Sequence, residues 1–169
     1  MKRLYVLRHA KSSWADPDLA DFDRPLNERG LQTAPFMGSV MQKNGYIPEV
    51  IFSSSATRAR QTAELAVKGG QLKTEIRFDD QIYEASPQSL RLVTSEISEE
   101  FASAMVVGHN PGIEGFIRFL TNNLEPMPTA ALAVIDLDVT SWDEISAGRG
   151  KVVRIIRPKD ELRMPSTSN

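Results

Sequence analysis

Short apolar segments alternate with longer amphipathic ones along this chain, and this alternation limits the possible folds more than any other feature. Six segments are rich in β-branched residues and lack polar alternation, which is typical of strands that are covered on both faces. They span residues 3–7, 49–53, 74–78, 104–107, 131–137 and 152–156. We expect each of them to form a strand of one sheet.

Four amphipathic segments between the strands favour helices. The first extends from an N-cap at Asn27 to Lys43, although Pro35 should shift its start or kink it. The others are a helix over residues 57–68 that stops at Gly69-Gly70, a helix that begins with Ser86 and Pro87, and a helix that begins near Pro111.

The order of these elements is typical of a three-layer α/β/α sandwich around a mostly parallel sheet, because a crossover helix returns each strand in the same direction. At 169 residues the chain can bury one sizeable core. We expect a single domain over residues 1–157 and a loose tail over residues 158–169. A polar loop over residues 12–24 is long enough to be functional.

Composition argues against several classes of function. The formal net charge of −2 disfavours a general nucleic-acid binder. The chain has no cysteine, which excludes disulfides, thiolate nucleophiles and cysteine zinc sites. No segment reads as a signal peptide or reaches the ~20 apolar residues of a membrane span. We expect a cytoplasmic protein that binds neither nucleic acid nor membrane, and the sequence does not indicate an oligomeric state.

Arginine and histidine residues follow three of the predicted strands. Arg8 and His9 end the first strand. Arg58 opens the helix after the second strand, and His109 follows the fourth. Because ligands of open parallel sheets bind at the carboxyl ends of the strands, these side chains should meet at one edge. Both histidines of the chain are then in the same place.

Each of these signals has an ordinary structural explanation when it is taken alone. A histidine at a strand end is commonly a turn residue or a partner in a hydrogen-bond network. The pair Arg58 and Arg60 suits a solvated helix face. The glycines on either side of His109 suit a turn between a strand and a helix.

Together, the residues favour phosphate chemistry. Arginine is a rigid, charged fork that matches two phosphate oxygens. A histidine between arginines is held neutral by their charge, and a neutral imidazole with a free lone pair is a nucleophile. Fixed cations also stabilise the equatorial oxygens during phosphoryl transfer. We therefore predict that the side chains at the end of the first strand face a phosphate.

Two other sites explain the same residues less well. The two histidines with nearby carboxylates suggest zinc, but the chain has no His-Glu-x-x-His pattern and the adjoining arginines would repel a cation. A nucleotide-binding P-loop fails as well, because the segment Gly148-Arg149-Gly150-Lys151 lacks the required outer glycine and is followed by Val152.

These motifs resemble the histidine phosphatase superfamily, the group of phosphoglycerate mutases and acid phosphatases. The resemblance covers roughly the first two-thirds of the chain. It rests on Arg8-His9, Ser54-x-x-x-Arg58-Ala59-x-x-Thr62, Gly108-His109 and the segment Leu26-Asn27-Glu28-Arg29-Gly30. It implies the phosphoglycerate mutase-like fold. The short chain and its form Arg8-His9-Ala10-Lys11-Ser12 are most similar to the SixA type, which dephosphorylates phosphohistidine in phosphorelay proteins.

Carried over residue by residue, the resemblance implies a role for each of five side chains. His9 is the nucleophile that becomes transiently phosphorylated. Arg8 and Arg58 hold the phosphoryl oxygens, and His109 donates to a non-bridging oxygen. Glu84 lies where many members keep the general acid, with an exposed loop glutamate as the ordinary alternative. The resemblance implies no metal or organic cofactor, because the arginines supply the positive charge.

One residue departs from the family pattern. The commonest form of the first motif has glycine after the histidine, whereas this chain has Ala10. A side chain at this position leaves the backbone less freedom to approach a phosphate. Because alanine is still small, we expect activity to survive.

Three functions follow from these observations. The first is a phosphatase that works through a phosphohistidine intermediate and acts on phosphohistidine in a partner protein. The second is a phosphatase for small phosphomonoesters. The third, from another class, is a phosphate-binding regulatory module without catalysis. A mutase is less favoured, because this short chain lacks insertions that would enclose a substrate for retransfer.

Overall fold

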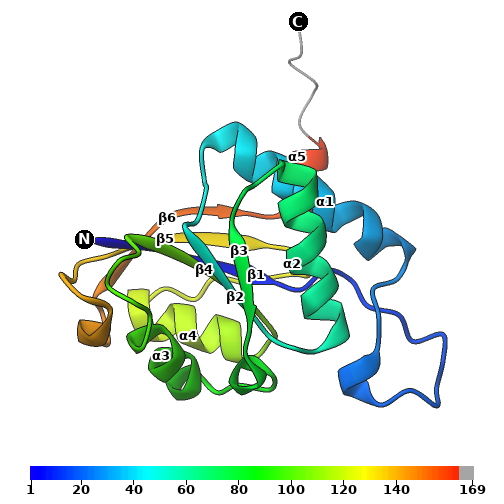
Figure 1. Cartoon of the computed structure of the whole chain (residues 1–169), viewed down its shortest axis with the longest axis horizontal. Helices are drawn as coiled ribbons and strands as arrows, with labels where there is room; N and C mark the ends of the chain where they lie inside the picture. Colours follow the sequence, from blue (N-terminus) through cyan, green and yellow to red (C-terminus); the bar gives the residue numbers. More distant parts are fainter. Residues whose placement is uncertain (164–169) are drawn as a thin grey trace, which may run out of the picture.

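The computed structural model describes residues 1–163, which form a six-stranded sheet with helices on both faces (Figure 1). The strands are β1 (Lys2–Arg8), β2 (Val50–Ser53), β3 (Glu75–Phe78), β4 (Ser103–Gly108), β5 (Leu132–Leu137) and β6 (Gly150–Ile156). Their order across the sheet is β3-β2-β4-β1-β5-β6. The six predicted strands are confirmed, with bounds that differ by two residues at most.

The sheet is mostly parallel, as predicted, and β5 is its one antiparallel strand. β2 pairs in parallel with β3 and β4, and β4 pairs in parallel with β1. β5 runs antiparallel to both β1 and β6. The chain returns to the carboxyl edge of β1 before β5 begins, where the N–H of Ala130 donates to the carbonyls of Arg8 and His9. This return reverses the direction of β5.

The helices form the two outer layers, which confirms the α/β/α class. α1 and α2 cover one face of the sheet, and α3 and α4 cover the other (Figure 1). Their bounds are Glu28–Asn44 (α1), Thr57–Gly70 (α2), Pro87–Ser95 (α3) and Gly112–Thr121 (α4). Three short 3-10 helices complete these layers, namely η1 (Asp21–Asp23), η2 (Asp80–Ile82) and η3 (Trp142–Glu144).

Strand β1 contributes to the core on both faces of the sheet. Leu4 and Val6 belong to the cluster beneath α3 and α4. Tyr5 and Leu7 belong to the cluster beneath α1 and α2. Because successive side chains of a strand point to opposite faces, both faces need apolar residues here. This explains the lack of polar alternation in the first apolar run.

Helix α1 begins where the sequence predicts. The side chain of Asn27 accepts a hydrogen bond from the N–H of Gly30 at 2.9 Å, which satisfies one free donor of the first turn. Gly45 ends the helix in the left-handed conformation, with a φ of 72°. Pro35 lies inside the helix and does not shift its start.

Helix α2 continues two residues beyond its predicted end at Lys68. Gly69 and Gly70 stay helical, and Gln71 takes the left-handed cap position with a φ of 52°. A Cβ on Gly69 would lie 2.1 Å from the carbonyl oxygen of Pro35 in α1. The glycine therefore lets the two helix backbones touch, and this tertiary contact prevails over the local stop signal.

The expected loose tail is wrong for its first part. Residues Pro158–Arg163 form a short helix, α5, with proline at its first position. The N–H of Glu161 donates to the carbonyl of Arg157, and its carboxylate pairs with Arg154 of β6 at 3.3 Å. The first bond closes a helical turn, and the ion pair joins the segment to β6. The rest of the predicted tail, residues 164–169, lies outside the described residues.

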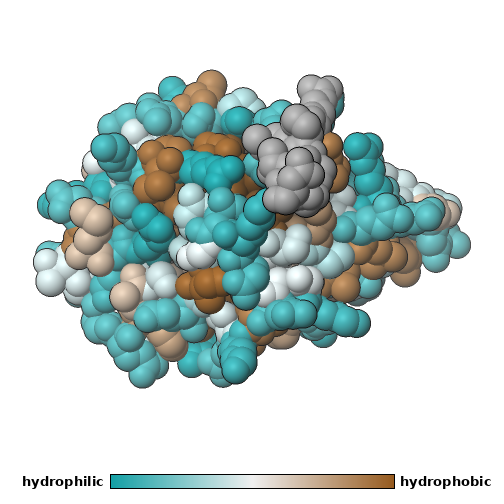
Figure 2. All heavy atoms as spheres, turned by 90° about the horizontal axis from the view of Figure 1, so that it is seen from above, coloured by the Kyte–Doolittle hydropathy of each residue, from teal (hydrophilic) through white to brown (hydrophobic). Residues whose placement is uncertain are grey.

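Seen from the side of α5, the surface is mostly hydrophilic (Figure 2). Apolar residues on this face form separate patches among the polar ones. None of the helices within residues 1–163 is long and apolar enough to cross a membrane.

Candidate active site

The carboxyl ends of β1 and β4 lie side by side in the sheet. Arg8 pairs in register with Gly108, and the N–H of His9 donates to the carbonyl of Gly108 at 3.0 Å. The rings of His9 and His109 consequently lie 5.1 Å apart between their centroids. The two histidines are neighbours at the edge where the sequence places them.

His9 is buried at the end of β1, with 6% of its surface exposed. Its Nδ1 lies 2.7 Å from the carbonyl oxygen of Ala10. Because a carbonyl only accepts hydrogen bonds, Nδ1 carries the proton of the neutral ring and Nε2 keeps its lone pair. Burial, and then the charges of Arg58 and Arg8, lower the pKa of His9 to about 4. His9 is therefore a neutral imidazole with a free Nε2 near pH 7.

Ala10 accommodates the position at which the family commonly has glycine. Its side chain is fully buried, and its backbone lies outside the left-handed region that favours glycine. Its N–H donates to the hydroxyl of Thr62 at 2.9 Å, and that hydroxyl donates to the carbonyl of Arg58 at 2.7 Å. Ala10 thus connects the backbone next to His9 to helix α2.

His109 has one satisfied ring nitrogen and one free one. Its Nε2 lies 2.8 Å from Oγ of Ser54, whereas its buried Nδ1 has no partner within residues 1–163. Burial, and then the adjacent His9 and Arg58, lower the pKa of His109 to about 3, so this ring is also neutral. When the Ser54 hydroxyl donates to Nε2, the ring proton lies on Nδ1 and is available to a bound oxygen.

Asp21 of η1 holds Arg58 in place at the start of α2. Two guanidinium nitrogens of Arg58 donate to Asp21, one to its carbonyl at 2.7 Å and one to its carboxylate at 3.0 Å. Arg58 is buried except for 6% of its surface. This pairing supplies the negative charge that a buried guanidinium requires in the absence of an anion.

Arg8 is fixed by the loop that precedes β5. One of its guanidinium nitrogens donates to the carbonyl of Met127 at 3.0 Å. Burial is the largest influence on this group and lowers the pKa of Arg8 from its ordinary value. The charge of Glu114 also acts on Arg8, but its hydrogen-bond partner is a neutral carbonyl, so its guanidinium can still pair with an anion.

Three buried side-chain nitrogens have no hydrogen-bond partner in the described part of the chain. They are Nε of Arg8, Nε of Arg58 and Nδ1 of His109. An unsatisfied buried donor costs about 1–3 kcal/mol, so native proteins contain few of them. All three belong to residues that the sequence assigns to phosphate binding. A bound oxyanion would bring acceptors to this group of donors.

Glu84 lies at a cleft that two of the three predicted phosphate-binding residues also line. The cleft has a volume of about 760 Å³, and Glu84 lines it together with Arg58 and His109. Glu84 is exposed and has a φ of 52°, a left-handed conformation that is uncommon for a residue with a side chain. Such strain often marks functional positions. The position agrees with a general acid, a role that stays a prediction.

The sequence assigns no role to Asp21 or Tyr83, which meet at the site. The Tyr83 hydroxyl donates to the Asp21 carboxylate at 2.6 Å, and its ring meets that of His109 edge-on at 5.5 Å. The hydrogen bond from Tyr83, and then that from Arg58, lower the pKa of Asp21 to about 2. Asp21 is therefore charged when it holds Arg58. The length of the polar loop was the only signal, and it does not single out this residue.

The zinc alternative gains no support from the geometry. Within residues 1–163, no three His, Asp or Glu side chains lie together in a way that would hold a metal ion. The charges of Arg58 and Arg8 act on His9 and would repel a cation. The arrangement suits an anion.

The two buried histidines should make the stability of the protein depend on pH. Their folded pKa values of about 4 and about 3 lie below the ordinary value of 6.5. Below pH 6.5 the unfolded chain therefore binds protons that the folded chain does not, so stability falls as the pH is lowered. The loss between pH 7 and pH 5 should be on the order of 1–2 kcal/mol per histidine.

Urea unfolding followed by circular dichroism at each pH measures this effect. The double variant His9→Gln/His109→Gln should lose less free energy of unfolding over the same interval than the wild type. An equal loss in both proteins would show that the histidines are not held neutral in the fold.

Comparisons with known proteins show the family of this chain. The family described as the histidine phosphatase superfamily (branch 1) matches residues 4–111, a stretch that contains Arg8, His9, Arg58 and His109. An uncharacterized chloroplastic protein of Arabidopsis thaliana is 31% identical over 174 residues, which cover 95% of this chain and 80% of that protein.

Solved structures show the same fold. The crystal structure of a candidate phosphohistidine phosphatase SixA from Agrobacterium tumefaciens has a TM-score of 0.81 and 30% identity, and covers 93% of this chain and 98% of that one. A structure of the protein histidine phosphatase SixA with tungstate has a TM-score of 0.77 and 20% identity, and covers 94% of this chain and 99% of that one. At this identity the similarity supports the fold alone. With the family match extending from β1 to the residues after β4, this chain belongs to the histidine phosphatase superfamily.

Proposed function

We propose that this protein is a phosphatase that takes the phosphoryl group of its substrate onto His9 and then transfers it to water. One observation carries the proposal: Arg8, Arg58 and His109, which each have an unpartnered buried nitrogen, act on or lie beside His9, a neutral histidine whose Nε2 is unprotonated. An anion would satisfy the donors, and the free Nε2 would be the nucleophile. Membership in the histidine phosphatase superfamily supports the same chemistry.

In the first half-reaction, the Nε2 lone pair of His9 attacks phosphorus. The bond from phosphorus to the leaving atom breaks, and its electron pair stays with the leaving group. Arg8 and Arg58 bind the non-bridging oxygens, and His109 donates to one of them from Nδ1. His9 acquires a positive charge when it is phosphorylated, and the Ala10 carbonyl at Nδ1 stabilises that charge.

In the second half-reaction, water attacks the phosphorus of the phosphorylated histidine. The bond from phosphorus to Nε2 breaks, and its electron pair returns to the His9 ring. The water gives up one proton, to the leaving group if that is still bound or to bulk solvent, and inorganic phosphate departs. Because Arg8 and Arg58 supply the positive charge, we expect turnover in the presence of a chelator.

Phosphohistidine in a partner protein is the substrate that we propose. Its leaving group is imidazole, which departs more readily than an alkoxide. The cleft is bordered by the exposed residues Glu84, Ser86 and Pro111, so its mouth is open to a protein surface. The similarity to the candidate SixA protein of Agrobacterium tumefaciens supports this choice. A small phosphomonoester is the alternative, and its alkoxide leaving group must be protonated.

Replacing Glu84 by glutamine should separate these two substrates. On a phosphomonoester, loss of the general acid should lower kcat by about 10²-fold or more. On a phosphohistidine protein, kcat should change by less than about threefold, because imidazole leaves without help from Glu84. The measurement is phosphate release with chelator present, on both substrate types.

Glu64→Gln provides a matched control, because Glu64 is an exposed carboxylate on the outer face of α2 and does not line the cleft. It should leave turnover of both substrates unchanged. A large loss in Glu84→Gln on phosphohistidine would contradict our choice of substrate. Binding of phosphate without turnover on any substrate would instead support the regulatory module.

A further inference from the structure

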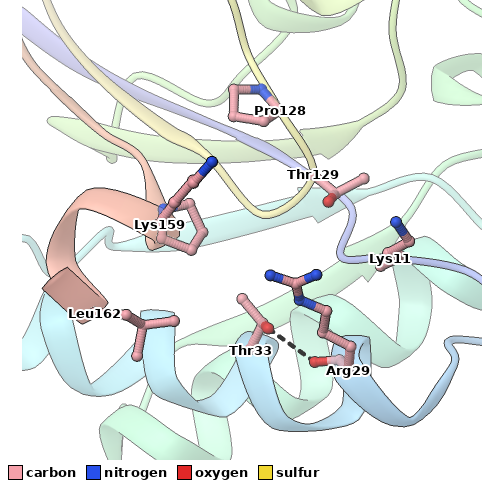
Figure 3. Close-up of a pocket in the computed structure, with 8 residues that line it drawn as sticks. Lys11, Arg29, Thr33, Pro128, Thr129, Lys159 and Leu162 are labelled. Carbon is pink, nitrogen blue, oxygen red and sulfur yellow. Dashed lines mark hydrogen bonds between the residues drawn. The ribbon is translucent and has the colours of Figure 1, made fainter.

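A second pocket lies near the end of β1 and shares no lining residue with the active-site cleft. Its volume is about 190 Å³, and it is enclosed by α1, α5 and the loop that leads into β5 (Figure 3). Its lining residues include Lys11, Arg29, Thr129 and Lys159. None of these four lines the cleft beside Arg58. The pocket is therefore a separate site, although Lys11 follows His9 by only two residues.

Three cationic side chains from three parts of the chain line this pocket, and no acidic residue lines it. Lys11 follows β1, Arg29 belongs to the first turn of α1, and Lys159 belongs to α5. Arg29 extends from α1 into the space between the other two (Figure 3). The ion pairs found within residues 1–163 all join other residues. The pocket thus concentrates positive charge that no ion pair of the described chain offsets.

Other lining groups suit an anionic ligand as well. The hydroxyl of Thr129 faces the same space and adds a donor (Figure 3). The hydroxyl of Thr33 is already used, because it donates to the carbonyl of Arg29 at 2.8 Å. The volume is many times what a single water requires, so a phosphate group fits with part of its hydration shell.

We propose that this pocket binds a phosphate-class anion at a site distinct from the catalytic one. A doubly charged phosphate offsets two of the three positive charges, whereas a carboxylate offsets one. The guanidinium of Arg29 matches two phosphate oxygens at once, and the lysines act as point charges beside it. The proposal concerns binding and does not depend on the reaction proposed for the active site.

The apolar part of the pocket suggests how the phosphate is carried. Pro128, Pro158 and Leu162 line it together with the cations. A free phosphate leaves these apolar surfaces exposed to water. The organic group of a phosphate ester or phosphonate would cover them and so increase the affinity. Inorganic phosphate and phenylphosphonate are therefore the two probes. The phosphorus–carbon bond of phenylphosphonate is not a phosphatase substrate, so the probe survives the measurement.

Amide NMR titration of the whole protein can distinguish the two sites. Thr33 on α1 and Leu162 on α5 report on the pocket, and His9 and His109 report on the catalytic site. Each probe is added at constant ionic strength, with sodium chloride in a parallel titration. In wild type, we expect the Thr33 and Leu162 signals to shift and saturate with the phosphorus probes. Tighter binding of phenylphosphonate would identify an organic phosphate as the preferred source.

The variant Arg29→Gln/Lys159→Gln removes two of the pocket cations, and both side chains are exposed. It should weaken the response at Thr33 and Leu162 by roughly tenfold or more, while the response at His9 and His109 stays as in wild type. The matched control, Lys43→Gln/Lys68→Gln, removes the same charge from exposed ends of α1 and α2. The response of its Thr33 and Leu162 signals to each probe should equal that of wild type.

Three results would overturn the proposal. The first is equal movement of the Thr33 and Leu162 signals in sodium chloride. The second is an unchanged midpoint of the phosphate titration at Thr33 and Leu162 in Arg29→Gln/Lys159→Gln. The third is a weakening of the same response in the control variant that equals the weakening in Arg29→Gln/Lys159→Gln. Loss of the response at His9 and His109 alone would count against the proposed catalytic site and not against this one.

Discussion

Replacing His9 by asparagine is expected to lower kcat/KM for phosphoryl hydrolysis by at least about 10⁴-fold, because the variant has no nucleophile. Asparagine is close in size to histidine, and its amide can still donate to the carbonyl of Ala10 as Nδ1 of His9 does. It cannot provide the lone pair of Nε2. The measurement is phosphate release from a phosphohistidine protein and from small esters, with chelator present.

The His9→Asn variant should still bind phosphate, which separates a chemical defect from a folding defect. Arg8, Arg58 and His109 hold the oxygens in our account, and the variant leaves all three in place. Its affinity for inorganic phosphate at the catalytic site should therefore change little. Wild-type turnover in His9→Asn would mean that the phosphoryl group does not pass through this residue.

Replacing Arg58 by glutamine should lower kcat by about 10²–10³-fold, the usual loss when one fixed donor to the transition state is removed. The variant loses a guanidinium that is almost fully buried beside both histidines. It also removes one of three partners of the Asp21 carboxylate, which keeps its bonds to Tyr83 and Arg24. Steady-state kinetics on the substrate with the higher activity measures the loss.

Arg60→Gln is the matched control, since Arg60 lies two residues further along the same helix. Arg60 is exposed and stacks on the ring of Phe78, with its guanidinium 4.8 Å from the ring centroid. It should retain kcat within about twofold, as is usual for surface changes. Equal losses in the two variants would indicate that general positive charge on α2 matters, and not a bound phosphoryl group at Arg58.

The sequence predicts the location of the site because the information there is local. Arg8 and His9 follow an apolar strand directly, and His109 follows another. Parallel pairing of β1 with β4 then brings the two histidines together. The residues that support them are not predictable in this way. Asp21 and Tyr83 are separated by 62 residues and meet only in the fold.

The same distinction explains where the predicted fold differs from the observed one. The start of α1 at Asn27 follows from a single side-chain hydrogen bond to Gly30, so the local pattern is sufficient. The end of α2 depends on contact between Gly69 and the backbone of Pro35 in another helix. Glu161 of helix α5 pairs with Arg154 of β6. Neither contact is visible in a local pattern.

The phosphorylated enzyme is the species that tests the central claim most directly. Turnover of a ³²P-labelled phosphohistidine protein is stopped in alkali within the first turnover, since phosphohistidine survives alkali and decomposes in acid. Our account predicts acid-labile label on this protein, located by mass spectrometry on the peptide that contains His9 and absent from His9→Asn. Product formation without bound label, or the same label on His9→Asn, would contradict the account.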